Sequence, residues 1–197
     1  MLSTISKMYI TLMPAIFAGI LNMVWCKAPL AKSLSKPIDA NRTLRDGQPI
    51  FGENKTYKGF VGMIIFGTVL TALWGEICAQ SADLQAQSFL YVNHENTFLY
   101  NCALGALFGL SYAAFELPNS FLKRRLKISP GKPKRGALGA FFVFLDQADS
   151  VFGMVLVVAA VYPMPLYFYL GYVLLGAATH LVLNMLLYKL HLRKNPF

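Results

Sequence analysis

Five long apolar stretches decide what this chain can fold into. They cover residues 8–26, 59–79, 97–116, 138–162 and 166–188 of a 197-residue sequence. A helix needs about 20 apolar residues to cross the ~30 Å hydrocarbon core of a bilayer, and each stretch approaches or exceeds that length. Charged residues make up only 14% of the sequence, against about 25% in an ordinary soluble domain. We therefore predict an all-α integral membrane protein with about five transmembrane helices, in a single polytopic domain over residues 1–197.

The positions of the basic residues predict how these helices are oriented. Apart from Lys7, all of the 18 Lys and Arg residues lie between the first two spans, between the third and fourth, or after the fifth. The loops around residues 81–96 and 163–165 contain none. Because Lys and Arg accumulate in loops that stay in the cytoplasm, we expect both basic loops and the C-terminus in the cytoplasm. The N-terminus would then lie outside the cytoplasmic membrane of the cell.

The two basic loops are expected to have distinct structures. The first contains Pro37, Gly47 and Gly52 among polar residues, so it should turn repeatedly. Connections of its length are usually either functional or disordered. The first half of the second loop is expected to extend the third span as a helix, which Pro130 and Pro133 would end.

An aspartate pair in the fourth span is the strongest chemical signal. Asp146 and Asp149 are three residues apart, so both project from one face of a helix, about two turns inside the span. Burying two carboxylates there is unfavourable unless they are paired or bind a cation. A divalent ion such as Mg²⁺ suits these hard oxygen ligands. The alternative is a structural pair bonded to basic residues of a neighbouring span, although no basic residue lies in the interior of any predicted span.

Glu116 is a third acidic residue at the same predicted end of the membrane. Ser120, Lys123 and Arg124 follow it at helical spacing, so all four can share one helix face. Glu116 can serve as a metal ligand or as an ordinary ion-pair partner of Arg124, and the sequence leaves both open.

The segment Phe51–Gly59, just before the second span, is a second signal. It contains Asn54, Lys55, Thr56 and Lys58 between glycines. A Walker A motif is absent, but lysines, a hydroxyl and main-chain N–H groups at a helix start can still bind phosphates. Basic anchoring at lipid headgroups is the alternative interpretation.

The basic run Lys123–Arg125 has the same two interpretations, phosphate binding or contact with anionic headgroups. Nucleic acid is not expected as a partner, because no aromatic interleaving or known motif accompanies the charge. In the fifth span, His180 and Asn184 form an i, i+4 pair at a depth similar to the aspartates. They can hydrogen-bond the acidic site or stabilise helix packing. Gly105 and Gly109 form a GxxxG pattern typical of close helix contact.

Taken together, these patterns place phosphate-binding cations and metal-binding carboxylates at one membrane surface. That combination favours chemistry between a water-soluble phosphate compound and a membrane lipid, in which a metal neutralises charge on phosphate oxygens. No Ser/His/Asp or Cys/His set occurs at a suitable depth, so covalent acyl chemistry is not expected.

Four segments together resemble the CDP-archaeol synthase family, a branch of the wider CDP-diacylglycerol synthase group. They are 36–39 continuing through 46–47, 51–59, 120–125 and 146–149, and His180, Asn184 and Tyr188 also look similar. The resemblance extends over most of the chain in the same order. Phe115-Glu116 replaces a Gly-Asp of the bacterial diacylglycerol enzymes, and their His-Gly-Gly before the aspartates is absent, which favours the archaeol branch.

The resemblance implies an Mg²⁺-dependent enzyme that transfers the cytidylyl group of CTP to a membrane lipid phosphate, with the active site facing the cytoplasm. Asp146, Asp149 and Glu116 would bind the metal. The CTP phosphates would be bound by five loop residues, Asn54, Lys55, Thr56, Lys58 and Gly59. The lipid phosphate or the triphosphate would be bound by four helix residues, Ser120, Lys123, Arg124 and Arg125. Of these, Lys123 and Arg124 would also act in catalysis, and His180 and Asn184 would support the site from behind.

Three other functions stay open at this stage. A CTP-dependent kinase acting on a polyprenol-type alcohol would release CDP instead of pyrophosphate. A small transporter would use the aspartate pair without consuming CTP, although no inverted repeat is evident. A non-catalytic assembly partner would not bind Mg·CTP tightly. The sequence also leaves a homodimer open.

Overall fold

The five apolar stretches are five helices in the computed structural model, which describes residues 2–129 and 136–191. They are α1 (Leu2–Lys27), α2 (Tyr57–Ala79), α4 (Phe98–Arg125), α5 (Ala137–Val161) and α6 (Leu166–Lys189). Each is long and apolar enough to cross a membrane, and the described part of the chain contains no β-strand. These helices confirm the predicted all-α architecture. Pro130 and Pro133, which are predicted to end a helix, lie outside the described residues.

Helix α4 is the longest helix and extends well past the predicted span. It has 28 residues, continues through Pro118 and ends at Arg125. This confirms that the first half of the second basic loop is helical. As a result, Lys123 and Arg124 stand on the same helix as Glu116, about two turns further toward its end.

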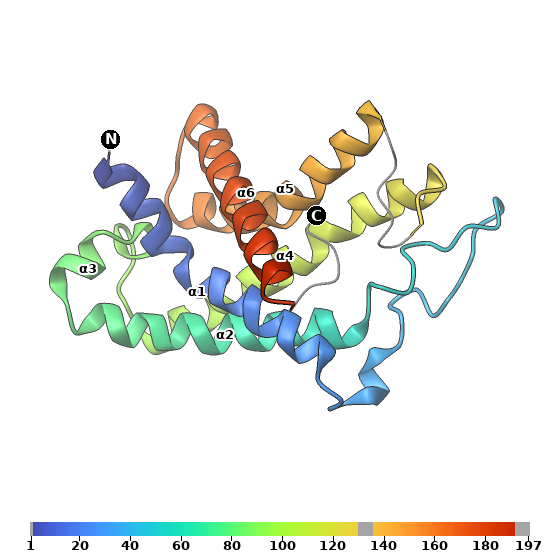
Figure 1. Ribbon diagram of the computed structural model, residues 1–197. Coiled ribbons are helices and arrows are strands. Elements are labelled where there is room, and N and C mark those ends of the chain that lie inside the picture. Colours follow the sequence, from blue (N-terminus) through green and yellow to red (C-terminus); the bar gives the residue numbers. More distant parts are fainter. Residues whose placement is uncertain (1, 130–135, 192–197) are drawn as a thin grey trace.

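Glycines bring α2 and α4 into backbone contact. A Cβ atom added to Gly105 would lie 2.3 Å from the carbonyl oxygen of Gly67, and one added to Gly109 would lie 2.3 Å from that of Met63. Only glycine permits such an approach, which is the packing that the GxxxG pattern predicts. The two helices lie side by side at this contact, and the last part of α4 extends away from α2 (Figure 1).

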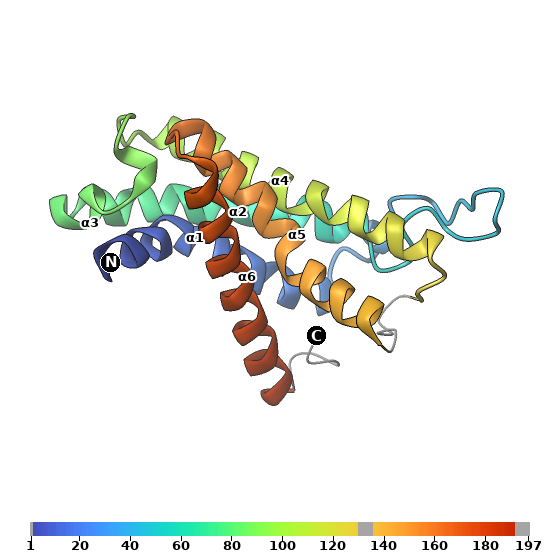
Figure 2. The same cartoon turned by 90° about the horizontal axis from the view of Figure 1, so that it is seen from above.

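The remaining helices build outward from this pair. Helix α1 packs against α2, and α5 packs against α4. In both ribbon views α6 crosses α2 and α4 steeply, and it packs mainly against α5 (Figures 1 and 2). This arrangement leaves space between α1, α4, α5 and α6.

The connection between α2 and α4 closes one end of the bundle. It contains the short helices α3 (Ala82–Ala86) and η2 (Phe89–Tyr91). Phe89 is buried, stacks on Tyr162 with ring centroids 4.6 Å apart, and donates its backbone N–H to Thr11 Oγ1 at 2.9 Å. The charged residues described below lie toward the other end, where the first basic loop is.

The first basic loop is ordered around the carboxylate of Asp39. This group accepts backbone N–H bonds from Asn41 at 3.0 Å, Phe51 at 2.8 Å and Gly52 at 2.9 Å. Burial alone would raise the pKa of Asp39, but these N–H groups hold it below its usual value. The N–H of Ile38 also bonds the carbonyl of Lys55 at 2.8 Å. The turn-rich loop is thereby fixed at the residues that lead into α2.

The far part of the same loop is tied to the end of α4. The guanidinium of Arg125 binds both carboxylate oxygens of Asp46 at 2.6 Å. It also donates to the carbonyls of Gln48 and Pro49. Nη1 and Nη2 of one guanidinium thus bind the loop at separate points, and the loop lies beside the end of α4 (Figure 1).

Candidate active site

A cavity of about 600 Å³ lies between α1, α4, α5, α6 and the end of the first basic loop. Its lining contains these predicted site residues: Asn54, Lys55, Glu116, Ser120, Lys123, Arg124, Asp146, Asp149, His180 and Asn184. The structure thus brings together ten side chains that come from four separate segments of the sequence.

The two aspartates of α5 face α4 across this cavity. The side-chain amide of Asn119 lies between them and donates to Asp146 Oδ1 at 2.7 Å and to Asp149 Oδ2 at 2.7 Å. Asp149 is 8% exposed, and its Oδ1 accepts the backbone N–H of Ser150 at 2.7 Å. One carboxylate oxygen from each aspartate therefore points at the same small volume.

Lys123 neutralises Asp146 in this arrangement. Its Nζ lies 2.6 Å from Oδ1 and 2.5 Å from Oδ2 of that carboxylate. The pair agrees with the alternative that basic residues of a neighbouring helix bind the aspartates. The interior of each predicted span lacks a basic residue, but α4 continues past the apolar stretch and so places Lys123 beside Asp146. Asp149, by contrast, forms no ion pair with any of the described residues.

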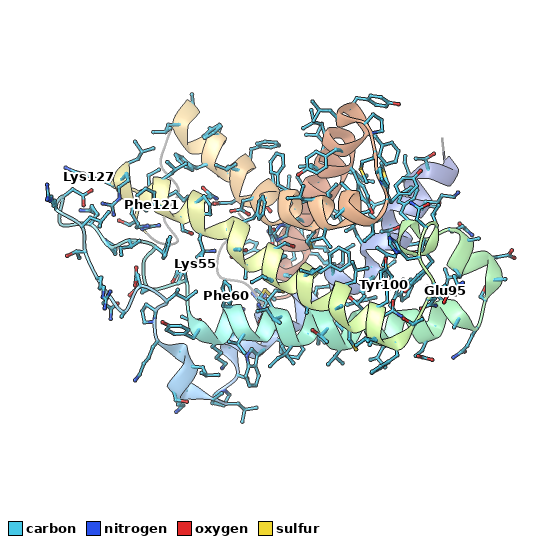
Figure 3. All side chains as sticks on the ribbon, turned by 180° about the vertical axis from the view of Figure 1, so that it is seen from behind. Lys55, Phe60, Glu95, Tyr100, Phe121 and Lys127 are labelled. Carbon is cyan, nitrogen blue, oxygen red and sulfur yellow. The ribbon has the colours of Figure 1, made fainter. Side chains whose placement is uncertain are left out.

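Glu116 forms an ion pair with Lys55, which reaches the cavity from the loop before α2. Both side chains are 24% exposed. Burial alone would lower the pKa of Lys55, but Glu116 raises it above its usual value, and Asp149 and Asp146 act in the same direction. Lys55 lies between the start of α2 and the body of α4 (Figure 3). The structure thus pairs Glu116 with Lys55, not with Arg124.

Lys58, three residues after Lys55, points elsewhere. Its Nζ donates to the carbonyl of Ala28 at 2.7 Å and lies 4.8 Å from the centre of the Trp25 ring. This contact ties α2 to the residue after α1, and Lys58 does not line the cavity. Of the two lysines that the sequence treats alike, only Lys55 is in a position to meet a ligand there.

Three more predicted site residues lie outside the main cavity. Arg125 is committed to Asp46 and the loop carbonyls. Thr56 caps α2, where its Oγ1 accepts the N–H of Gly59 at 3.2 Å. Thr56 and Gly59 line a smaller adjoining cavity of about 170 Å³, which shares Lys55 and Glu116 with the larger one.

Ser120, Arg124 and Asn54 complete the polar wall of the main cavity. Ser120 and Arg124 are 8% and 6% exposed, and Asn54 is exposed on the loop side. The Nε atom of Arg124 is buried and has no hydrogen-bond partner in the described part of the chain. Arg124 therefore has a donor free for an anionic ligand.

The polar pair of α6 supports the aspartates through the residue between them. Asn184 donates to Gln147 Oε1 at 2.6 Å, and His180 Nδ1 lies 3.2 Å from the Gln147 carbonyl oxygen. Since Gln147 lies between Asp146 and Asp149, these bonds fix the α5 turn that presents both carboxylates. His180 and Asn184 thus both contact Gln147.

The remaining cavity wall is apolar. It is formed largely by the facing sides of α1 and α6, including Leu12, Ile16, Ile20, Leu175, Leu183 and Leu187. Two hydrogen bonds join these helices, from Tyr172 to the Met8 carbonyl at 2.6 Å and between Tyr9 and Thr179 at 2.9 Å. A charged surface and an apolar surface thus share one cavity.

The structure does not gather the three predicted metal ligands, Asp146, Asp149 and Glu116, into one cluster. The described residues contain no group of three His, Cys, Asp or Glu side chains arranged to hold an ion. Asp146 and Asp149 nevertheless offer two carboxylate oxygens within 2.7 Å of one nitrogen atom, and hard oxygen donors of this kind suit Mg²⁺. Glu116 is ion-paired with Lys55, as Asp146 is with Lys123. The carboxylate oxygens gathered around the Asn119 amide nitrogen thus come from Asp146 and Asp149.

Three residues of this region were not singled out by the sequence patterns. Asn119 is at i+3 from Glu116, so the helical spacing that placed Ser120 and Lys123 also places Asn119 on that face. Gln147 was hidden between the two aspartates. Asp39 is in a segment that carries the family resemblance, but the sequence around it does not predict that its carboxylate accepts hydrogen bonds from the backbone of the same loop.

The chain is similar to proteins of known family over its whole length. A family model described as CarS-like, CDP-archaeol synthase, matches residues 1–197. The CDP-archaeol synthase of Methanoculleus marisnigri is 32% identical over 169 residues, which are 82% of this chain and 89% of the relative. That of Pyrococcus furiosus is 30% identical over 186 residues, 94% of each chain. A solved structure of an intramembrane enzyme for archaeal membrane lipids biosynthesis matches with a TM-score of 0.60 and 21% identity, covering 90% of this chain and 92% of that one. That match shows a shared fold.

Proposed function

The chain belongs to the CDP-archaeol synthase family, and from this premise we propose that it is a CTP-dependent cytidylyltransferase that produces a CDP-activated membrane lipid. One observation carries the proposal beyond the family name. Cations, carboxylates and an apolar wall share a single cavity of about 600 Å³ in a five-helix membrane protein. A nucleotide triphosphate and a lipid need that combination, since one is highly charged and the other is largely hydrocarbon.

In the proposed reaction, a phosphate oxygen of the lipid attacks the α-phosphorus of CTP. A new phosphorus–oxygen bond forms, the bond from the α-phosphorus to the α,β-bridging oxygen breaks, and pyrophosphate leaves. Catalysis of this kind depends on positioning and on charge stabilisation, with no covalent enzyme intermediate.

The side chains divide this work by position. Lys55, Lys123 and Arg124 present their charges to phosphate oxygens from the loop and from α4. Ser120 and Asn54 add neutral hydrogen-bonding groups, and the apolar sides of α1 and α6 hold the lipid chains. Thr56, Lys58, Gly59 and Arg125 act by keeping the loop and the start of α2 in place.

Asp146 and Asp149 would hold Mg²⁺, which when bound supplies positive charge against the phosphate oxygens. Glu116 is assigned to Lys55, whose ammonium it orients toward the cavity. His180 and Asn184 would hold the aspartates through Gln147.

We further propose that the basic end of the bundle faces the cytoplasm, in the cytoplasmic membrane, and that residues 1–197 form one domain. CTP is a cytoplasmic compound, and the distribution of Lys and Arg favours that orientation. The cavity would then open toward CTP while its apolar wall lies within the bilayer.

The experiment is to incubate the purified protein with CTP, Mg²⁺ and a panel of archaeal and bacterial lipid phosphates, and to identify the lipid product by mass. We expect a CDP-lipid and pyrophosphate, both lost when Mg²⁺ is chelated and in Asp149→Asn. Asn101→Ala, a change at a buried amide of α4 outside the cavity lining, is the matched control and should keep the activity. Full activity of Asp149→Asn would remove Asp149 from the metal site.

A further inference from the structure

Asn119 occupies an unusual place between the two aspartates. It is 4% exposed, and its amide nitrogen donates at 2.7 Å to one oxygen of each carboxylate. Both amide hydrogens are thus directed at the negative charges of Asp146 and Asp149. The amide is neutral, but its N–H groups contact the same two carboxylate oxygens that a bound cation would contact, so the nitrogen lies where a cation would fit.

The other half of the same amide lacks a partner. Asn119 Oδ1 is buried, and no donor among residues 2–129 and 136–191 bonds to it. A buried carbonyl oxygen without a hydrogen bond is costly, and such groups in native structures call for an explanation. The amide nitrogen of Asn119 therefore has its hydrogen-bond partners, and the amide oxygen has none.

Rotation of the amide by half a turn would exchange these two atoms. Without a cation, the rotation is unfavourable because it would bring a carbonyl oxygen against two carboxylates. With a divalent cation between the carboxylates, the amide hydrogens would be repelled and the oxygen attracted. The rotation breaks no bond of Oδ1, since that atom has no partner to lose.

We propose that Asn119 is the third protein ligand of the divalent cation, contributing its amide oxygen beside Asp146 and Asp149. This inference rests on the metal assignment of the proposed function and changes its membership, because Glu116 stays with Lys55. Amide and carboxylate oxygens are both hard donors of the type that Mg²⁺ and Mn²⁺ accept. In the cation-free protein the same residue holds the two carboxylates together.

The test measures metal binding without CTP or lipid. The full chain in detergent is titrated with Mn²⁺ as a probe for Mg²⁺, and free Mn²⁺ is followed by electron paramagnetic resonance. We expect Asn119→Ala to weaken Mn²⁺ binding by about 10-fold or more, the scale seen when groups that build a metal site are removed. The matched control is Asn101→Ala, a buried amide on the same helix whose side chain bonds Asn96 and Tyr91 outside the cavity. It should leave the Mn²⁺ affinity unchanged.

A second variant covers the case in which Asn119→Ala does not fold. Asn119→Asp has the same shape but adds a third carboxylate, so its metal-free form should melt below wild type. Mn²⁺ should then raise its melting temperature by more than it raises that of wild type.

Three results would overturn the inference. If wild type and Asn119→Ala bind Mn²⁺ equally well, Asn119 only holds the carboxylates together and the two-aspartate metal site survives. If Mn²⁺ stabilises Asn119→Asp no more than wild type, the cation binds away from this amide. If wild type itself binds no Mn²⁺, both this inference and the metal assignment of the proposed function fail.

Discussion

The ammonium of Lys123 on α4 contacts both oxygens of the Asp146 carboxylate on α5, with 2.6 Å from Nζ to Oδ1. The two side chains are 18% and 33% exposed, so water screens the pair only in part. In the proposed reaction each partner has another task, because Lys123 would contact phosphate and Asp146 would contact Mg²⁺. In the absence of substrate and metal, the two side chains therefore neutralise each other's charge.

A double variant that removes both charges separates the structural role of the Lys123–Asp146 pair from its role in the reaction. Lys123→Met should lower kcat/KM by roughly 100-fold, as loss of a group that stabilises developing charge typically does. It should also lower the melting temperature, since Asp146 loses its partner. Adding Asp146→Asn should restore the melting temperature without restoring activity. A double variant that recovers both would show that the pair is purely structural.

Lys55 and Lys58 provide a matched comparison within one short segment. Lys55→Met should lower kcat/KM for CTP by about 10- to 100-fold, the scale of a lost hydrogen bond between charged groups. Lys58→Met should change kcat/KM little, because that ammonium contacts the Ala28 carbonyl and Trp25. Its effect should appear as a lower melting temperature. Equal kinetic losses in both variants would contradict the separation.

Asp39→Asn tests whether the loop is held by one carboxylate. An asparagine cannot accept the three N–H bonds from Asn41, Phe51 and Gly52 equally well. We expect a loss of about 1.5–3 kcal/mol of stability at pH 7. The KM for CTP should rise with little change in kcat, since Lys55 follows this loop.

The pH dependence of the same variant has a defined sign. The pKa of Asp39 is lower in the folded protein than its usual value of 3.8, so the ionised carboxylate stabilises the fold above pH 3.8. That contribution disappears as the pH falls through the native pKa. The difference in melting temperature between wild type and Asp39→Asn should therefore be full at neutral pH and shrink below pH 3.8. A difference that is the same at all pH values would contradict a role for the charge.

Two glycines test the contact between α2 and α4. Gly105→Ala places a methyl group 2.3 Å from the Gly67 carbonyl oxygen, so it should cost about 1–3 kcal/mol through overpacking. Gly171→Ala, on α6, meets nothing within 4 Å and should be neutral or slightly stabilising. Thermal unfolding in detergent measures both. Similar losses at the two positions would show that helix propensity, not contact, decides.

Much of the fold follows from the sequence because the bilayer leaves few choices. Length and hydropathy place all five helices, and the position of Gly105 and Gly109 indicates the tight pair. The i, i+3 spacing of Asp146 and Asp149 places both on one face of α5, and α5 turns that face to α4. These are local rules, and each needs only a single helix to apply.

What the sequence does not reveal depends on contacts between segments. Lys55 and Lys58 look equivalent in composition, and only the loop around Asp39 turns one toward the cavity and the other toward α1. Arg125 resembles Arg124 in the same way, yet it binds Asp46 from a distant loop. Glu116 was expected beside the aspartates, and its ion pair with Lys55 could not be inferred without knowing where the loop returns to α4.

The central claim is that this cavity transfers the cytidylyl group of CTP to a lipid phosphate. The most direct test uses two preparations of CTP, labelled at the α-phosphate or at the γ-phosphate, with the purified protein, Mg²⁺ and an archaeal lipid phosphate. We predict that label enters the lipid only from the α-phosphate, and that the γ-label is recovered in pyrophosphate. Lipid labelled from the γ-phosphate, with CDP released, would instead show a kinase, and unconsumed CTP would contradict the enzyme assignment.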